Sequence, residues 1–295
     1  MGGRPNLFIV GAMRAGTTAL HEALESHPDV YMAPYKEPAY FTDPAQLATD
    51  SAVVAAAGYA GNTANYESLF ADAAAERYLG ESSTHYTKQP RITGVADRLA
   101  DYAPDARIIY IVRQPVERTI SHYRFEVQRR YETRSPLEAF RDDPIYVAVS
   151  DYARQIQPFI ERLGRDRVYL AVLEDLVENP ASELQALYEW LTIDLAAGVL
   201  ELPRSNALDG VTTKAPRATQ SVRKSGWYRS LVRLIPKGVR RAAKSVVDQP
   251  FDDSALRSSD VQDFLTEQLE PTIPAFEELA GRSFPTWRRT DAPEV

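Results

Sequence analysis

Two glycines near the start of the chain bracket a short loop that could bind an anion. Residues 11–18 read G-A-M-R-A-G-T-T and follow the apolar run 7–10. In a strand–loop–helix arrangement, backbone N–H groups and the positive end of the helix dipole converge on a phosphate-like group. We therefore expect a phosphorylated ligand to be bound by Arg14, Ala15, Gly16, Thr17 and Thr18.

The spacing of this loop resembles the nucleotide P-loop, G-x-x-x-x-G-K-[ST], with one departure. Thr17 stands where that motif has lysine, and the cation lies inside the loop as Arg14. A P-loop kinase needs its lysine on the β- and γ-phosphates and Mg²⁺ on the hydroxyl. No aspartate of the Walker-B type follows a strand either. A metal-dependent P-loop kinase acting on a small metabolite is therefore only the first alternative.

A second anion site is indicated at residues 113–123, which read R-Q-P-V-E-R-T-I-S-H-Y. Arg113 directly follows the clearest strand of the sequence, 107–112. Pro115 suits the first turn of a helix, where its missing N–H has no partner to lose. That helix would carry Ser121 about two turns in. An arginine fork with a hydroxyl suits a terminal phosphate dianion.

Titratable side chains follow two other expected strands. Lys36 and Glu37 come after the strand 30–33, and His85 comes after the polar end of the strand 78–83. Ligands gather at the carboxyl ends of parallel strands, so these groups could reach one cleft. On residue types alone, however, Lys36 and Glu37 read as a surface ion pair and His85 as a hydrogen-bonded loop histidine. Tyr131 and Phe140 are candidate aromatics on the substrate side.

Together these segments resemble the sulfotransferases that use 3′-phosphoadenosine 5′-phosphosulfate (PAPS), and especially those that modify glycans such as heparan sulfate. R-A-G-T-T at 14–18 is similar to their 5′-phosphosulfate loop, and residues 113–123 are similar to their 3′-phosphate site. R-K-S-G-W at 223–227 is similar to a late segment that folds over the nucleotide. The resemblance implies a P-loop-like fold, PAPS as co-substrate, and 3′-phosphate binding by Arg113, Ser121, Arg223, Lys224 and Gly226.

The same resemblance implies a reaction. K-E-x-x-x-F at 36–41 is similar to the glycan-modifying enzymes, whose base is the glutamate of that motif, so Glu37 is the expected general base. His85 is the second candidate, because small-molecule sulfotransferases use a histidine from a comparable region. Lys36 would either tune Glu37 or contact the donor. The sulfonate would pass by in-line attack to a hydroxyl of a small metabolite, lipid or glycoside, without a metal.

Apolar strands that alternate with helices must position these residues. Strands are expected at 7–10, 30–33, 78–83, 107–112 and 167–173, and helices at 17–26, 89–102, 152–163, 181–191 and 261–279. This order predicts an α/β protein with one central parallel sheet flanked by helices and right-handed crossovers. We expect a single domain over 1–295, with a donor-binding core at about 5–192 and a C-terminal basic lid and helical segment at about 205–288.

Composition excludes several classes of protein. The 295-residue chain has no cysteine, which excludes disulfides, thiolate metal sites and a cysteine nucleophile. Its net charge of −7 argues against general nucleic-acid binding and mildly disfavours long polyanionic acceptors. With no 18-residue apolar run and no apolar leader, a cytoplasmic protein without a membrane segment is expected.

One segment departs from this average charge. Residues 210–247 hold ten Lys or Arg and no Asp or Glu. For the part at 229–244 we favour a solvated basic helix face, with docking to an acidic membrane or carrier surface as the alternative. The sequence indicates no oligomeric state. A nucleotide-binding module without catalysis is the second alternative function.

Overall fold

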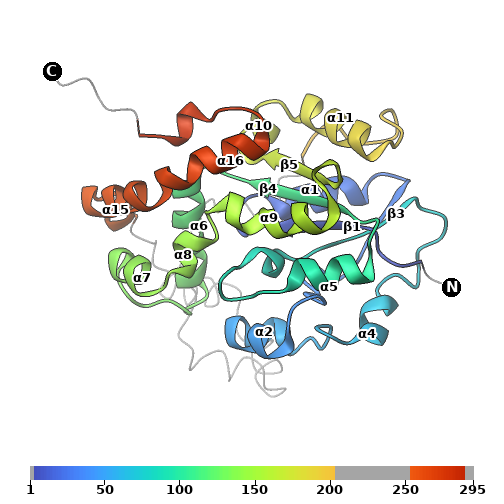
Figure 1. Cartoon of the computed structure of the whole chain (residues 1–295), viewed down its shortest axis with the longest axis horizontal. Helices are drawn as coiled ribbons and strands as arrows, with labels where there is room; N and C mark the ends of the chain where they lie inside the picture. Colours follow the sequence, from blue (N-terminus) through green and yellow to red (C-terminus); the bar gives the residue numbers. More distant parts are fainter. Residues whose placement is uncertain (1–2, 203–252, 290–295) are drawn as a thin grey trace, which may run out of the picture.

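The computed structural model describes residues 3–202 and 253–289. Five parallel strands form one sheet in the order β2-β3-β1-β4-β5 (Figure 1). The strands are β1 (Leu7–Gly11), β2 (Val30–Met32), β3 (Tyr78–Ser82), β4 (Arg107–Val112) and β5 (Val168–Val172). All five residues of β1 are buried, as expected for a central strand covered on both faces.

Helices cover both faces of the sheet. Because side chains alternate along a strand, Phe8 and Val10 of β1 face one core while Leu7 and Ile9 face the other. The first core includes α5 (Val95–Tyr102), α9 (Tyr152–Leu163) and α16 (Ile273–Ala280), and the second includes α1 (Thr17–Glu25) and α11 (Pro180–Leu191). In Figure 1, α5 and α9 lie in front of the strands.

A third core lies beside the sheet and joins segments that are distant in sequence. It contains residues of α6 (Pro115–Gln128), α7 (Pro136–Asp142), α8 (Ile145–Ala148) and α15 (Ser259–Leu269). The remaining elements are short: α2 (Pro44–Asp50), α3 (Ala52–Ala55), α4 (Thr63–Ser68), η1 (Thr84–Thr87), η2 (Arg165–Arg167), α10 (Leu173–Glu178), η3 (Ser254–Arg257), η4 (Glu270–Thr272) and η5 (Pro285–Trp287).

The α/β fold class and the parallel sheet are confirmed, while two expected helices are wrong in their extent. The helix expected at 89–102 begins only at Val95, after Gly94, which has a left-handed φ of 70°. The helix expected at 261–279 is interrupted between α15 and α16 by a 3₁₀ turn that contains Pro271. Proline lacks the N–H that continues a helix, so the interruption has a local cause.

The C-terminal described segment packs against the core. Trp287 stacks on Phe284 with ring centroids 4.2 Å apart and lies 5.9 Å from the ring of Tyr152 in α9. Of the expected basic lid and helical segment at about 205–288, only residues 253–288 are described. Arg223, Lys224, Gly226 and the basic segment 229–244 lie outside the described residues.

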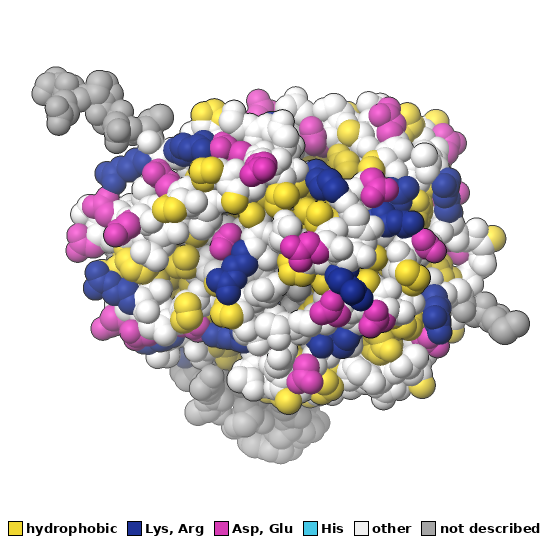
Figure 2. All heavy atoms as spheres, viewed as in Figure 1, with side chains coloured by type: hydrophobic (Ala, Val, Ile, Leu, Met, Phe, Trp, Pro, Cys, Tyr) yellow, Lys and Arg dark blue, Asp and Glu magenta, His cyan; other side chains and the backbone are white. Residues whose placement is uncertain are grey.

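The face shown in Figure 2 carries acidic and basic side chains interspersed, without a large area of one sign. None of the helices in the described part of the chain has the length and apolar character needed to cross a membrane.

Candidate functional site

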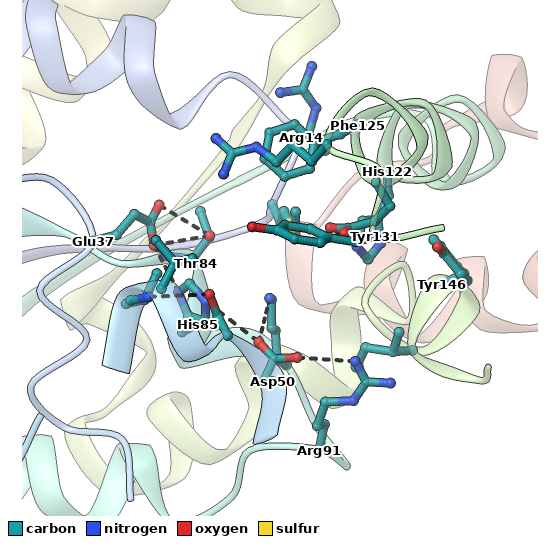
Figure 3. A pocket seen from close by; sticks show the side chains of 18 of the residues that line it. Arg14, Glu37, Asp50, Thr84, His85, Arg91, His122, Phe125, Tyr131 and Tyr146 are labelled. Carbon is teal, nitrogen blue, oxygen red and sulfur yellow. Dashed lines mark hydrogen bonds and ion pairs between the residues drawn. The ribbon is translucent and has the colours of Figure 1, made fainter. Parts of the chain in front are cut away.

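The carboxyl ends of the strands open into a cavity of about 690 Å³ (Figure 3). Its walls come from the loop after β1, the loop after β2, η1, α6 and the segment around α2 and α3. Six residues that the sequence predicted for the site line this cavity: Arg14, Thr17, Thr18, Lys36, Glu37 and His85. The parallel sheet therefore brings residues from three separate loops to one place.

The loop after β1 leads into α1 through a glycine in the left-handed backbone region. Gly16 has a φ of 96°, and a Cβ there would lie 2.7 Å from Cδ1 of Leu173. The N-cap residue Gly16 has no side chain to cap α1, and the first turn of the helix has no acidic residue. The amides of that turn and the hydroxyls of Thr17 and Thr18 are therefore suited to an anion. Ala15 is buried, and its N–H bonds to the carbonyl of Ala12.

Arg14 joins the two expected anion sites. Its Nε donates to Oγ of Ser121 in α6 at 3.2 Å, and its guanidinium lies 5.0 Å from the centroid of the Phe125 ring. Burial and the nearby charges of Arg113 and Arg129 lower the pKa of Arg14 to about 10. Within the described residues, Arg14 forms no ion pair with a carboxylate. A half-buried cation that pairs with no carboxylate in the described part of the chain is suited to an anionic ligand.

Lys36 supplies the cation that the loop lacks at position 17. Its Nζ donates to Oγ1 of Thr18 at 2.5 Å and to Oγ1 of Thr17 at 3.2 Å. Burial lowers the pKa of Lys36, while the charge of Glu37 opposes that shift. The lysine reaches the anion loop from the segment after β2 and stands beside the candidate base.

Glu37 is held by residues that follow β3. The backbone N–H of Thr84 donates to its Oε2 at 2.8 Å, the Thr84 hydroxyl lies 3.2 Å from both carboxylate oxygens, and Nδ1 of His85 lies 3.1 Å from Oε2. Its side chain remains about a quarter exposed, toward the cavity. Burial alone would raise the pKa of Glu37. The contact with His85 and the charges of His85 and Lys36 outweigh burial and lower it.

Arg113 lies at the junction between β4 and α6, outside the cavity lining but close enough to Arg14 to affect its pKa. Its Nη2 is 3.4 Å from Oε2 of Glu117, a partly buried contact. The hydroxyl of Tyr152 donates to the Arg113 carbonyl at 2.5 Å, and the Gln114 side chain caps the start of α6. The junction is thus anchored while the guanidinium stays partly exposed.

Several residues of the site were not expected from the sequence, and three of them contact expected site residues or their neighbours. Thr84 binds Glu37, Asp50 contacts His85, and the exposed Arg129 places its guanidinium 4.3 Å from the Phe125 ring that Arg14 also faces. Thr84 could have been found, because it comes two residues after the polar end of β3. Asp50 lies in a segment without periodicity, and nothing in the sequence distinguishes Arg129 from the charged residues around it.

The two candidate aromatics differ in position. The Tyr131 side chain lines the cavity, and Figure 3 shows its ring across the centre of the opening. Phe140 is 2% exposed within the third core, so its assignment to the substrate side was wrong. Ser82, at the end of β3, bonds to His21 in α1 at 2.8 Å and does not line the cavity.

Comparisons with known proteins agree on one family. The family model described as "Sulfotransferase family" matches residues 5–197. The membrane-associated sulfotransferase kil1 of Dictyostelium discoideum is 30% identical over 132 residues, 45% of this chain and 25% of that protein. Heparan sulfate glucosamine 3-O-sulfotransferase 3B1 of Mus musculus is 27% identical over 197 residues, 63% of this chain and 46% of that protein. The chain therefore spans about a quarter to a half of these relatives.

Among solved structures, a sulfotransferase from Alicyclobacillus acidocaldarius aligns with a TM-score of 0.67 and 24% identity, covering 97% of this chain and 100% of that chain. This similarity shows a shared fold, the P-loop-like α/β arrangement of helices around a parallel sheet.

Proposed function

The chain belongs to the sulfotransferase family, and we propose that it transfers the sulfonate of PAPS to a hydroxyl of a small metabolite, lipid or glycoside. One observation carries this proposal. Two cationic side chains, Arg14 and Lys36, lie together at the start of α1, where they could bind an anion. The carboxylate of Glu37 lies beside them in the same cavity. A base beside a sulfonate site is the arrangement that sulfonate transfer to a hydroxyl requires.

The donor fits the residues on both sides of Arg14. The loop after β1, with Thr17, Thr18 and Lys36, would hold the 5′-phosphosulfate. Arg113 and Ser121 would hold the 3′-phosphate, because Ser121 already bonds to Arg14 and Arg113 lies nearby. Gly16 supports this fit, since its φ of 96° lets the loop turn into α1 in a conformation that is strained for any residue with a side chain. By resemblance, Arg223, Lys224 and Gly226 would add to the 3′-phosphate site.

In the proposed reaction, Glu37 accepts the proton as the acceptor O–H bond breaks. The acceptor oxygen forms a bond to sulfur while the bond from sulfur to the phosphate oxygen breaks, and its electron pair leaves with the phosphate. Arg14 and Lys36 stabilise the negative charge that develops on the sulfonate and on the leaving phosphate. The Thr17 and Thr18 hydroxyls orient Lys36 for this role.

Geometry favours Glu37 over His85 as the base. The Glu37 side chain is about a quarter exposed and lies in the cavity, whereas the His85 side chain is only 7% exposed. Both ring nitrogens of His85 face carboxylate oxygens, at 3.1 Å from Glu37 and 3.5 Å from Asp50. An imidazole in that position is better suited to hold Glu37 than to approach an acceptor. The acceptor would lie against Tyr131, across the opening.

Ligand-induced thermal stabilisation tests the donor assignment. The protein should be stabilised by 3′-phosphoadenosine 5′-phosphate without Mg²⁺, because the site holds the phosphates with its own cations. Stabilisation by Mg-ATP and none by the bisphosphate would instead support the kinase alternative. Incubation with labelled PAPS and a panel of phenols, alcohols and sugars then measures turnover. Tight bisphosphate binding without turnover on any acceptor would support the non-catalytic module.

A further inference from the structure

We infer that Asp50 is a positioning residue for the proposed general base and acts on it through His85, an inference that rests on the proposed function. Asp50 is the last residue of α2, and its side chain is 2% exposed. Its Oδ2 lies 3.5 Å from Nε2 of His85, whose Nδ1 lies 3.1 Å from Oε2 of Glu37. Figure 3 shows the three side chains as one continuous row.

The row of carboxylate, imidazole and carboxylate has a chemical consequence. Asp50 contacts Nε2 on the far side of the His85 ring and so keeps Nδ1 directed at Oε2 of Glu37. A donor on Oε2 keeps Glu37 ionised and fixes its rotamer. Asp50 would thus orient His85, as the buried aspartate of a catalytic triad orients its histidine.

Asp50 is itself fixed in place. Nζ of Lys88 lies 2.7 Å from its Oδ2, and Nη1 of Arg91 lies 3.2 Å from its Oδ1. Nη2 of Arg91 is bound at 2.6 Å by Asp143, which does not contact His85. A buried carboxylate with two cationic partners is held rigidly, and it retains its charge. The nearby cations lower the pKa of Asp50 despite its burial.

These contacts also permit a purely structural role, in which Asp50 only ties α2 to the segment after η1. Any pH test must therefore take account of the other charged groups nearby. Those close to Glu37 are Lys36, His21, Tyr35 and Glu81, and those close to Asp50 are Lys88, Arg91, His122 and Glu126. The test needs a readout that anchoring alone would not change.

The pH dependence of turnover in Asp50→Asn provides that readout. We expect kcat to fall by at least about tenfold, a part of the roughly 10²–10⁴-fold that a general base contributes. The acid limb of the profile should move to higher pH, because Glu37 loses support for its ionised form. The KM for PAPS should stay unchanged. Asp143→Asn is the matched control, since it perturbs Arg91 without touching His85, and it should leave the acid limb unchanged.

His85→Gln covers the case in which Asp50→Asn does not fold. It keeps the pairs of Asp50 with Lys88 and Arg91, and it should shift the acid limb in the same direction. A wild-type acid limb in His85→Gln, or a lower Tm with an unchanged pH profile in Asp50→Asn, would overturn the inference.

A second measurement does not depend on turnover. In ¹⁵N-histidine spectra of the ligand-free protein, assigned with His85→Gln, the ring signals of His85 should shift in Asp50→Asn and not in Asp143→Asn. Unchanged ring signals of His85 in Asp50→Asn would contradict the inference, whether or not the protein is a sulfotransferase. Shifted signals in a protein without sulfotransferase activity would support the contact and refute only the proposed function.

Discussion

Glu37 is held in an unusual backbone conformation, with a φ of 66°. Its N–H bonds to the Ser82 carbonyl at 2.9 Å, and the N–H of Ala39, which also has a positive φ, bonds to Oγ of Ser83. Such conformations persist in non-glycine residues only where surrounding contacts enforce them, and they cluster at functional sites. The strain at Glu37 is therefore a second reason to test this residue first.

We predict that Glu37→Gln removes most turnover while donor binding is kept. The substitution preserves shape but removes the proton acceptor, so kcat should fall by roughly 10²–10⁴-fold. Affinity for 3′-phosphoadenosine 5′-phosphate, measured by calorimetry, should be nearly unchanged because Arg14 and Ser121 remain. Near-normal turnover in Glu37→Gln together with inactivity in His85→Ala would assign the base to His85 instead.

The pH profile gives an independent prediction for the same residue. The contact with His85 and the charge of Lys36 lower the pKa of Glu37, so its basic form persists to lower pH. Activity should be lost only as the pH falls below the ordinary glutamate value of about 4.3. The same lowered pKa makes Glu37 stabilising above that value, so folding must be monitored in parallel by circular dichroism. An acid limb near about 6.5 in a folded protein would indicate a histidine base.

Site residues that share one short sequence pattern could be predicted from the sequence. Arg14, Thr17 and Thr18 share one loop and one short pattern, and the cavity lining includes all three. Asp50 and Arg129 reach the site only through tertiary packing, so no local pattern marks them. Sequence reasoning also did not anticipate that Arg14 bonds to Ser121, a residue 107 positions away.

At the scale of elements, strands were easier to predict than helix ends. Buried parallel strands form apolar runs that stand out from their surroundings, as in β4. Helix ends depend on single residues instead. Gly94 delays the start of α5, and Pro271 separates α15 from α16. Both residues are visible in the sequence, but their effect depends on the packing that each helix must satisfy.

The junction between β4 and α6 yields a prediction for donor binding. Arg113→Ala should weaken binding of 3′-phosphoadenosine 5′-phosphate by about 1.5–3 kcal/mol, the cost of losing a charge-assisted partner. Tyr152 and Gln114 hold the backbone of the junction, so the fold should be kept.

Glu117→Gln provides the matched control for this junction. It removes the acidic partner of Arg113 and should leave donor affinity unchanged or slightly higher. Unchanged affinity in Arg113→Ala, measured by calorimetry, would mean that Arg113 does not contact the donor.

For the whole molecule, we expect residues 253–289 to fold as one unit with the sheet. Trp287 is 4% exposed, stacks on Phe276 and Phe284, and meets the ring of Tyr152 edge-on. Trp287→Ala should lower the free energy of unfolding by about 3–5 kcal/mol, as for other large buried side chains. The control Val177→Ala, at a side chain that is 69% exposed, should change it by less than about 0.5 kcal/mol. A separate early transition in urea, without this loss, would indicate an independent C-terminal unit.

The central place of β1 in the sheet has a kinetic consequence. β3 lies on one side of it, followed by Thr84 and His85, and β4 lies on the other, followed by Arg113 and α6. Acceptor and donor would thus be held on opposite flanks of one strand, and neither needs to leave before the other enters. Both substrates should be present together when the sulfonate moves. Double-reciprocal plots of initial rate at several fixed acceptor concentrations should therefore intersect, whereas parallel lines would indicate a sulfonated enzyme intermediate.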